Sequence, residues 1–433
     1  MQINFRFQKR QNEFQNNMTE EHLALRREKF AVELRKNKRS QKIQKRRNSY
    51  SVLKENASFP RKLIPQELVQ LEPSLADPKV SDANKYLAVF VLLKNTPSIQ
   101  TATMCIQTLS KVIVSESSSD ILLSLNAHKL LNNFACSKEK ALQVLAVDCM
   151  MNIAEQSQQA CKTLLLEGCV DSIIEFGNPD QRKSCLRTLG CFADYENINI
   201  DVVLQAGIHK RVLNSYLNLE SPLLEVAIRL IGNICSGSDS QTQEVLDLNL
   251  CDTLASVCEC PKPRVRRILY WTLSNIAAGT PSQVKYLIKH PVFERALQGL
   301  KDSNQGVRIE VSTILGNISR VLEDDEKILG KLDKHLQEVK AGLEDRNPEV
   351  LIQVLKFCKK LLSHGRYESD QIQVLENAML EKLQDSGVME AIASLLQFPN
   401  SKVSQKAAGI LDEFQLEDQD LELLDPVNEF EFS

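Results

Sequence analysis

Asparagine side chains recur at a regular interval in this 433-residue chain. They belong to short segments of the form L-x-N-I or a close variant, whose third positions are 152, 191, 233, 275 and 317, in steps of 39, 42, 42 and 42 residues. Position 191 is Cys and the other four are Asn. A side-chain amide donates and accepts hydrogen bonds at once, so a row of amides could hold the backbone of an extended peptide. The chemistry that this pattern predicts is binding.

The single Trp of the chain lies close to one of these amides. Trp271 precedes Asn275 by four residues, so the two share a helix face, and an indole ring can stack the stem and charge of Lys or Arg. Glu310, seven residues before Asn317 on the same predicted face, would complement a cation. Two structural alternatives stay open, because a lone helical Asn is more often solvated or a cap, and Trp271 could simply fill a groove wall.

Residue patterns that carry catalysis or bind metals are missing from the sequence. The six His form no H-E-x-x-H segment, and neither a phosphate-binding Gly loop nor a G-x-S-x-G elbow occurs. The 12 Cys are scattered singly except for Cys258 and Cys260, which have no His nearby. Zinc sites and disulfide frameworks need tighter spacing. We therefore predict buried reduced thiols, no enzyme activity, no metal and no cofactor.

The elements that must position the amides are helices. With 15 Gly and 14 Pro the chain has too few turn residues for an all-β fold, and its apolar residues fall in helical windows. A period of about 42 residues, with two or three helices in each unit, is that of armadillo or HEAT repeats. We predict an all-α superhelical solenoid of armadillo or HEAT repeats whose third helices line a groove. The apolar runs are too short to span a membrane, and no hydrophobic secretory signal follows Met1.

Charge is unevenly distributed along the chain. Residues 1–62 carry 17 Lys and Arg against 6 Asp and Glu, a balance of +11 that leaves −14 for the remainder, since the whole chain carries −3. From Leu411 onward there are nine acidic residues and no basic ones. Residues 22–48 contain no Pro or Gly and predict a flexible basic N-terminal helix that orders on a partner. These charges are consistent with two hypotheses, a helix that binds nucleic acid and a nuclear localisation signal.

Several segments resemble the importin-α family, the adaptors that carry nuclear localisation signals. Residues 270–282 (YWTLSNIAAGTPS) look like its seventh armadillo repeat, and 230–246 (LIGNICSGSDSQTQEVL) are similar to the repeat before it. The order of E-L-R-K-N-K-R at 33–39 and K-R-R-N at 45–48 resembles the importin-β-binding segment of the family. Residues 387–408 are similar to its terminal repeat. The match in order favours the importin-β-binding reading of the basic helix over the other two.

The resemblance implies an all-α, right-handed superhelical armadillo-repeat solenoid with two binding sites. The groove of the family binds basic nuclear localisation signal peptides, and the matching positions are Asn152, Arg229, Asn233, Trp271, Asn275, Glu310 and Asn317. Its arm binds importin-β, and the matching positions are Arg26, Arg27, Leu34, Arg35, Lys36, Lys38, Arg39, Lys45, Arg46 and Arg47. By resemblance, Lys45, Arg46 and Arg47 also dock in the protein's own groove, and the last repeat meets a recycling exportin with Ran-GTP. The protein would shuttle between cytoplasm and nucleus, without binding nucleic acid or membrane.

The sequence departs from the family toward the N-terminal end of the array, where the family has its major cargo site. The repeat extends about 41 residues upstream of Asn152 to a marker position at Lys111. At the Trp positions, four residues before markers 111, 152, 191 and 317, the chain has Gln107, Asp148, Arg187 and Thr313. This predicts a weakened major site, with Asn152 its clearest remnant, and a better-kept minor site around Trp271. Two hypotheses follow: an import adaptor for basic signal peptides, or a non-import armadillo scaffold that keeps the importin-β-binding arm and has lost most signal-peptide binding.

These interpretations divide the chain into four parts. We predict an importin-β-binding arm at 1–62, a Pro-containing linker at 63–80, an armadillo array of about eight repeats at 81–416 and an acidic tail at 417–433. The linker is assigned from its X-Pro positions, which resist helix formation.

Overall fold

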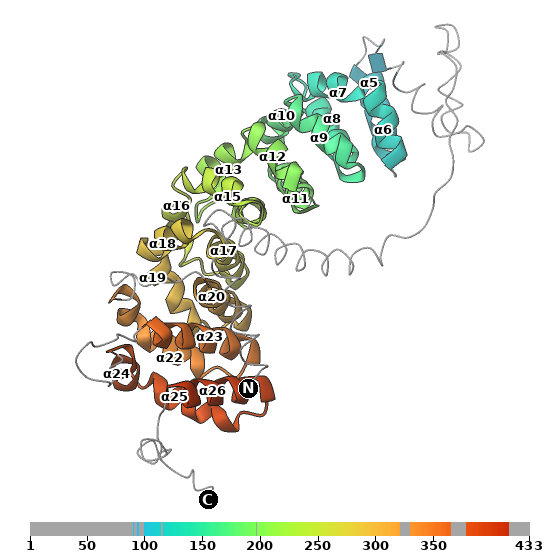
Figure 1. Ribbon diagram of the computed structural model, residues 1–433. Coiled ribbons are helices and arrows are strands. Elements are labelled where there is room, and N and C mark those ends of the chain that lie inside the picture. The colour runs from blue at the N-terminus through green and yellow to red at the C-terminus, as the bar shows by residue number, and fades with distance from the viewer. Residues whose placement is uncertain are drawn as a thin grey trace, which may run out of the picture. The chain divides into compact units, whose positions relative to one another are not determined.

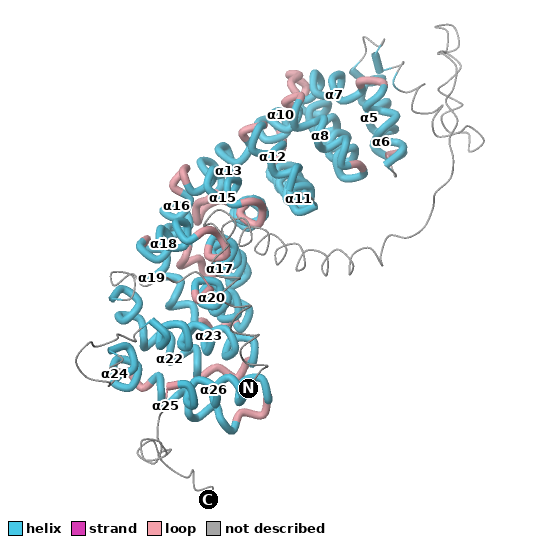
Figure 2. The backbone as a smooth tube through the Cα atoms, viewed as in Figure 1, coloured by secondary structure: helices cyan, strands magenta, loops and turns pink. Residues whose placement is uncertain are grey.

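The computed structural model of the chain describes residues 90, 93–94, 99–113, 116–195, 197–320, 330–364 and 378–414. Every regular element in these residues is a helix, as Figures 1 and 2 show, and the prediction of an all-α protein is confirmed. The helices fall into two compact units. We describe each by itself, as the first stack, which ends at Gly237, and the second stack, which begins at Ser238.

From α6 onward, the helices of the first stack recur in threes. Two short helices are followed by a longer one in each set, for example 9, 9 and 17 residues in α6, α7 and α8. Its helices are α5 (Ile99–Val112), α6 (Glu116–Ser124), α7 (Ala127–Ala135), α8 (Lys140–Gln156), α9 (Gln158–Leu166), α10 (Cys169–Phe176), α11 (Pro179–Tyr195), α12 (Asn197–Gln205), α13 (Ile208–Tyr216) and α14 (Leu224–Ile234).

The second stack repeats the same order and adds short 3₁₀ turns. Its helices are α15 (Asp239–Leu246), α16 (Leu250–Val257), α17 (Pro263–Ile276), α18 (Pro281–Lys289), α19 (Pro291–Gln298), η2 (Gly299–Lys301), α20 (Gln305–Ile318), η3 (Asp333–His335), α22 (Leu336–Leu343), α23 (Pro348–His364), α24 (Ala378–Asp385), α25 (Val388–Ser394), η4 (Leu395–Gln397) and α26 (Ser401–Glu413). Proline opens several of them, because the first helical turn needs no donor at that position.

Helices at equivalent places pack on one another in both stacks. In the first stack the third helices α5, α8, α11 and α14 contact their neighbours in that order. In the second stack α17, α20, α23 and α26 do the same, and so do the second helices α16, α19, α22 and α25. Each unit therefore covers its apolar face with the next unit, which is the packing of an armadillo solenoid. The fold class predicted from the repeat period is confirmed.

A left-handed residue marks the junction between the first and second helix of most units. The φ angles of these residues lie between 57° and 73°, and the residues are Asn126, Gly168, Gly207, Asn249 and Gly387. Glycine and asparagine are the residues that adopt this conformation at the lowest cost, so the junction reverses the chain within two residues. Gly168 and Gly207 form this turn in the first stack.

Leu, Ile, Val and Cys side chains fill the space between the helices. The twelve cysteines form no disulfide in the described part of the chain, and only Cys136 and Cys191 are exposed. Burial raises the pKa of the thiols of Cys149, Cys185 and Cys358 to about 12. Among the described helices none is long and apolar enough to cross a membrane.

Candidate functional site

The recurring asparagines connect each third helix to the one before it. In three units the side-chain amide nitrogen Nδ2 donates to a backbone carbonyl of the preceding third helix, in the pairs Asn152 to Ser110 (3.4 Å), Asn233 to Gly190 (2.7 Å) and Asn317 to Ser274 (2.8 Å). The acceptor is always one residue before the preceding marker position. The register that was recognised in the sequence therefore corresponds to one repeated contact in the stack.

The contact supplies a donor to a carbonyl at the end of a helix. Near the end of α17 the backbone amide of Ala277 donates to the carbonyl of Leu273, and that of Ala278 donates to the carbonyl of Asn275. The carbonyl of Ser274 is passed over by this change of pattern and accepts from Asn317 instead. Carbonyls at helix ends need a partner outside the helix, so the Asn amide meets a requirement of the fold.

Part of each amide's hydrogen-bonding capacity remains after this contact. An Asn side chain has two N–H donors and an acceptor oxygen, and the stack uses one donor. Asn152 and Asn317 are partly exposed, whereas Asn233 is only 6% exposed. No other described residue donates a hydrogen bond to Oδ1 of Asn317. Asn152 and Asn317 can therefore offer an acceptor and a second donor to a ligand, and their side chains are already oriented.

In the second stack the predicted peptide-binding residues lie on two neighbouring helices. Trp271 and Asn275 follow one another by one turn on α17, and both are half-buried. Glu310 and Asn317 lie on α20, which packs against α17. Thr313 is 8% exposed, and its hydroxyl donates to the carbonyl of Ile309 at 2.8 Å, so it offers no platform for a cation. The structure brings Trp271, Asn275, Glu310 and Asn317 onto one pair of helices.

The carboxylate of Glu310 is already engaged within the protein. Its Oε1 lies 3.5 Å from Nε of Arg267, which precedes Trp271 by one turn on α17. The Arg267 side chain is 58% exposed and that of Glu310 is 15% exposed. The acidic position that was predicted to complement a ligand cation is therefore partly occupied by a cation of the chain itself.

Both helices of this pair are held at their N-terminal halves by the same kind of ion pair. On α17, Arg266 donates to Asp302 through Nε (2.7 Å) and through a second guanidinium nitrogen (3.0 Å). On α20, Arg308 donates through Nε to Asp345 (2.6 Å). The Asp302 carboxylate is 10% exposed, and although burial opposes its ionisation, the hydrogen bonds and charge of Arg266 outweigh burial and lower its pKa. These pairs fix the helices that carry the candidate site.

The first stack presents a different surface at the equivalent place. A groove of about 910 Å³ is lined by residues of α5, α8 and α11, among them Gln107, Asp148, Asn152, Glu155, Lys183 and Arg187. Asp148 stands at a predicted Trp position and accepts a hydrogen bond from the buried Gln181 (2.9 Å). Ser184 and Thr188 donate to Glu155. The groove is polar, with charges of both signs and no aromatic side chain in its described lining.

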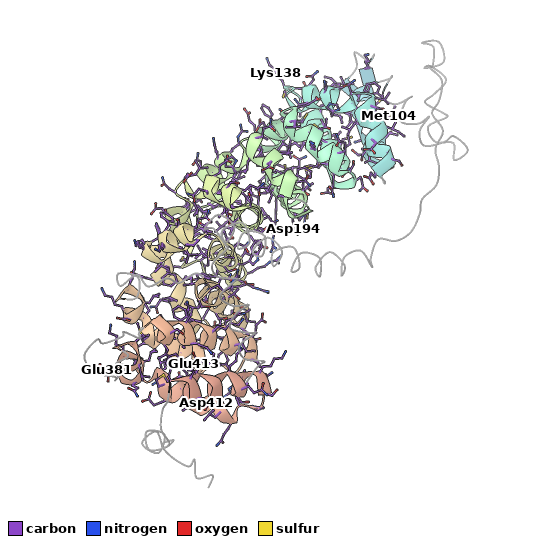
Figure 3. The ribbon with its side chains drawn as sticks, in the orientation of Figure 1. Met104, Lys138, Asp194, Glu381, Asp412 and Glu413 are labelled. Atoms are coloured by element: carbon purple, nitrogen blue, oxygen red, sulfur yellow. The ribbon has the colours of Figure 1, made fainter. Side chains whose placement is uncertain are left out.

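Two marker positions have Cys or Lys in place of Asn. Cys191 is exposed at the marker position of α11. Lys359, one period after Asn317 on α23, lies 2.5 Å from the carboxylate of Glu413. Glu413 is labelled at the end of α26 in Figure 3. The ladder of amides is thus restricted to some units, and the remaining predicted residue, Arg229, is half-buried on α14 of the first stack.

Other predicted positions cannot be placed. The residues predicted to bind importin-β, from Arg26 to Arg47, lie outside the described residues, as do the whole linker at 63–80 and the whole acidic tail at 417–433.

Several residues that bear on the site were missed in the sequence analysis. Arg267 lies 43 residues before Glu310, the same interval that separates Ser274 from Asn317, so the register could have identified that pair. Gln353 of α23 was also missed. Its side chain covers Gly316, where a Cβ atom would come within 2.1 Å of the Gln353 Oε1. Nothing in the local sequence marks Gln353, because its position depends on how α23 packs on α20.

Comparison with known proteins adds to this geometry. Residues 10–123 match the family model of the importin beta binding domain. A stretch of 101 residues is 33% identical to importin subunit alpha-1a of Oryza sativa subsp. japonica, and it covers 23% of this chain and 19% of that protein. The matched stretch thus spans about a fifth of the length of this relative. In these residues the chain is similar to the importin-α family, and its described helices have the armadillo fold.

One solved structure that covers most of this chain supports the fold. An engineered protein has a TM-score of 0.61 at 18% identity, over 81% of this chain and 84% of its own. Computationally designed armadillo repeat proteins for modular peptide recognition are also similar, with a TM-score of 0.49 at 20% identity, over 58% of this chain and 99% of theirs. At such low identity the likeness to the engineered protein concerns the fold alone.

Proposed function

We propose that this importin-α-like chain is an adaptor that joins proteins carrying basic nuclear localisation signals to importin-β and shuttles between cytoplasm and nucleus. The observation that carries the proposal is the match of residues 10–123 to the importin beta binding domain, because it includes all the predicted arm positions from Arg26 to Arg47. Importin-β would bind this arm, and a recycling exportin with Ran-GTP would bind at the last repeat. The excess of basic charge in residues 1–62 supports an acidic partner for the arm.

Signal peptides would bind across the third helices. Packed helices lie about 8–10 Å apart, and an extended peptide covers that distance in about three residues. One peptide could therefore accept from and donate to successive Asn amides while a Lys or Arg stacks on Trp271. The partial exposure of Trp271 and Asn317, and the fixed orientation of the Asn317 amide, support this use of the surface.

The test is a titration of the full chain with a labelled peptide that contains an uninterrupted run of Lys and Arg residues. Replacing Trp271→Ala together with Asn275→Ala is expected to weaken binding by about tenfold to a hundredfold, since each lost contact is worth about 1 kcal/mol. Tyr286→Ala is the matched control, because Tyr286 is an exposed aromatic residue on α18, which is not one of the third helices. If the unsubstituted chain does not bind the peptide at micromolar concentration, the proposed binding of signal peptides is wrong.

A non-import scaffold is the second candidate function. The mixed charges of the first-stack groove, the burial of Thr313 and the Arg267–Glu310 ion pair support it, since each weakens a cation site. A pull-down with importin-β and a basic cargo peptide distinguishes the two functions. The adaptor captures both partners, whereas the scaffold captures importin-β only. Replacement of Arg35, Lys36, Lys38 and Arg39 by Ala is expected to abolish capture of importin-β in either case.

A further inference from the structure

Arg267 crosses from α17 to α20 at the N-terminal end of the candidate site. Its Nε lies 3.5 Å from Oε1 of Glu310, so the ion pair spans the two helices that carry Trp271 and Asn317. Trp271 is one turn after Arg267 on the same helix face. A cation stacked on Trp271 would consequently lie close to the guanidinium of Arg267.

The path of the Arg267 side chain depends on Gly306. A Cβ atom at Gly306 would come within 3.0 Å of the Arg267 Cδ and 3.2 Å of its Nε, so the side chain lies directly against the backbone of α20. Gly306 precedes Glu310 by one turn, and the absence of its side chain gives Arg267 room to reach that carboxylate. The contact between Arg267 and Glu310 therefore depends on the space above Gly306 as well as on the two charges.

We infer that Arg267 occupies the cation position at Glu310 when no ligand is bound, and so determines which basic peptides the second stack accepts. The inference rests on the proposed peptide-binding function. An incoming Lys or Arg must displace Arg267 from Glu310, and it meets a like charge beside Trp271. Arg267 is 58% exposed, so its side chain can leave without unfolding the helix. Peptides with a neutral or acidic residue opposite Arg267 would be preferred to an unbroken basic run.

The experiment compares Arg267→Gln with the unsubstituted full chain in titrations of the same labelled Lys and Arg peptide. Arg267→Gln keeps most of the side-chain length and removes the charge. We expect it to tighten binding about fivefold, since an exposed ion pair changes an equilibrium constant by about that factor. Lys289→Gln on α18 removes the same charge from an exposed position in the second stack and is expected to leave the affinity unchanged.

Combining Arg267→Gln with Glu310→Gln separates occupation of the site from simple repulsion. With Glu310 replaced, Arg267 has no carboxylate to release, so the gain from Arg267→Gln should be smaller than in the unsubstituted chain. Equal gains in both backgrounds would overturn the inference, because Arg267 would then act only through its charge. An unchanged or weakened affinity in Arg267→Gln would overturn it as well.

The same titrations distinguish the inference from the proposed function. If the unsubstituted chain binds the peptide and Arg267→Gln does not change the affinity, the proposed function is supported and the inference is rejected. Binding that appears only in Arg267→Gln supports the inference in its strongest form. Failure of every variant to bind the peptide rejects signal binding and the inference with it, while capture of importin-β remains a separate measurement.

Discussion

Asn233 illustrates how one side chain serves the fold at the scale of a residue. Its amide is 6% exposed and donates to the Gly190 carbonyl at 2.7 Å, so little of it faces solvent. Asn152 and Asn317 make the same contact from more exposed positions. A residue type expected at a binding surface is thus also required between the units, and its recurrence has a structural cause even where no ligand is reached.

Replacing Asn233→Ala is expected to lower the free energy of unfolding by about 1–2 kcal/mol, because the Gly190 carbonyl loses a buried donor. Chemical denaturation followed by circular dichroism measures the change. Asn218→Ala is the control, since Asn218 is exposed in the loop before α14. Equal denaturation midpoints for Asn233→Ala and the unsubstituted chain would contradict the structural role of this amide.

The ion pair of Arg266 and Asp302 gives a pH-dependent prediction. Because the folded pKa of Asp302 is lowered, its stabilising contribution is complete above the unfolded value of about 3.9 and is lost as the pH falls through the folded pKa. Asp302→Asn is expected to cost about 1–3 kcal/mol at neutral pH, and the cost should shrink below about pH 4.

Thermal unfolding at a series of pH values measures this difference. Asp412→Asn on the exposed side of α26 is the matched control and should follow the unsubstituted chain at every pH. A cost for Asp302→Asn that is as large in acid as at neutral pH would show that the lost contact is not the ionised pair.

At the scale of elements, close approach between helices depends on glycine at one junction. Gly299 begins the turn η2 after α19, and this turn packs on α20. A Cβ atom there would come within 2.8 Å of a methyl group of Val311 and 3.2 Å of the Tyr270 ring. Both neighbours are buried, so neither can move into solvent. The junction therefore helps to set the spacing of the two helices that carry the candidate site.

Gly299→Ala is expected to destabilise the protein by about 1–3 kcal/mol, since extra volume in a packed core forces its neighbours to shift. Gly409→Ala on α26 is the matched substitution, because a Cβ atom there would meet nothing within 4 Å. It should raise stability by about 0.5–1 kcal/mol through better helix propensity. Denaturation midpoints measure both, and a stabilising Gly299→Ala would contradict the close packing of η2.

At the scale of the whole molecule, cysteine burial is a property of the stacked units taken together. Ten of the twelve thiols lie between helices, and only Cys136 and Cys191 are exposed. Burial raises the pKa of Cys149 and Cys358 to about 12, so their reactive thiolate forms are scarce near neutral pH. The repeated packing protects thiols that are far apart in the sequence.

Brief treatment of the folded chain with iodoacetamide at mildly alkaline pH is expected to modify Cys136 and Cys191 and to leave the buried thiols intact. Peptide mass spectrometry locates the modified residues. The same treatment in denaturant is the control and should modify all twelve. Rapid modification of Cys149 in the folded chain would show that the first stack opens more readily than its packing indicates.

The sequence by itself determined the helical repeat, the common register of the asparagines and the pairing of Trp271 with Asn275 on one face. These follow from periodicity, which is encoded within each unit. Only the tertiary structure decided that Asn317 donates to Ser274 and that Arg267 reaches Glu310. Such contacts join residues more than 40 positions apart, and their existence depends on the depth and rotation with which one third helix packs on the next. That geometry is set by many side chains together, such as Gly306 beneath Arg267, and no single repeat contains it.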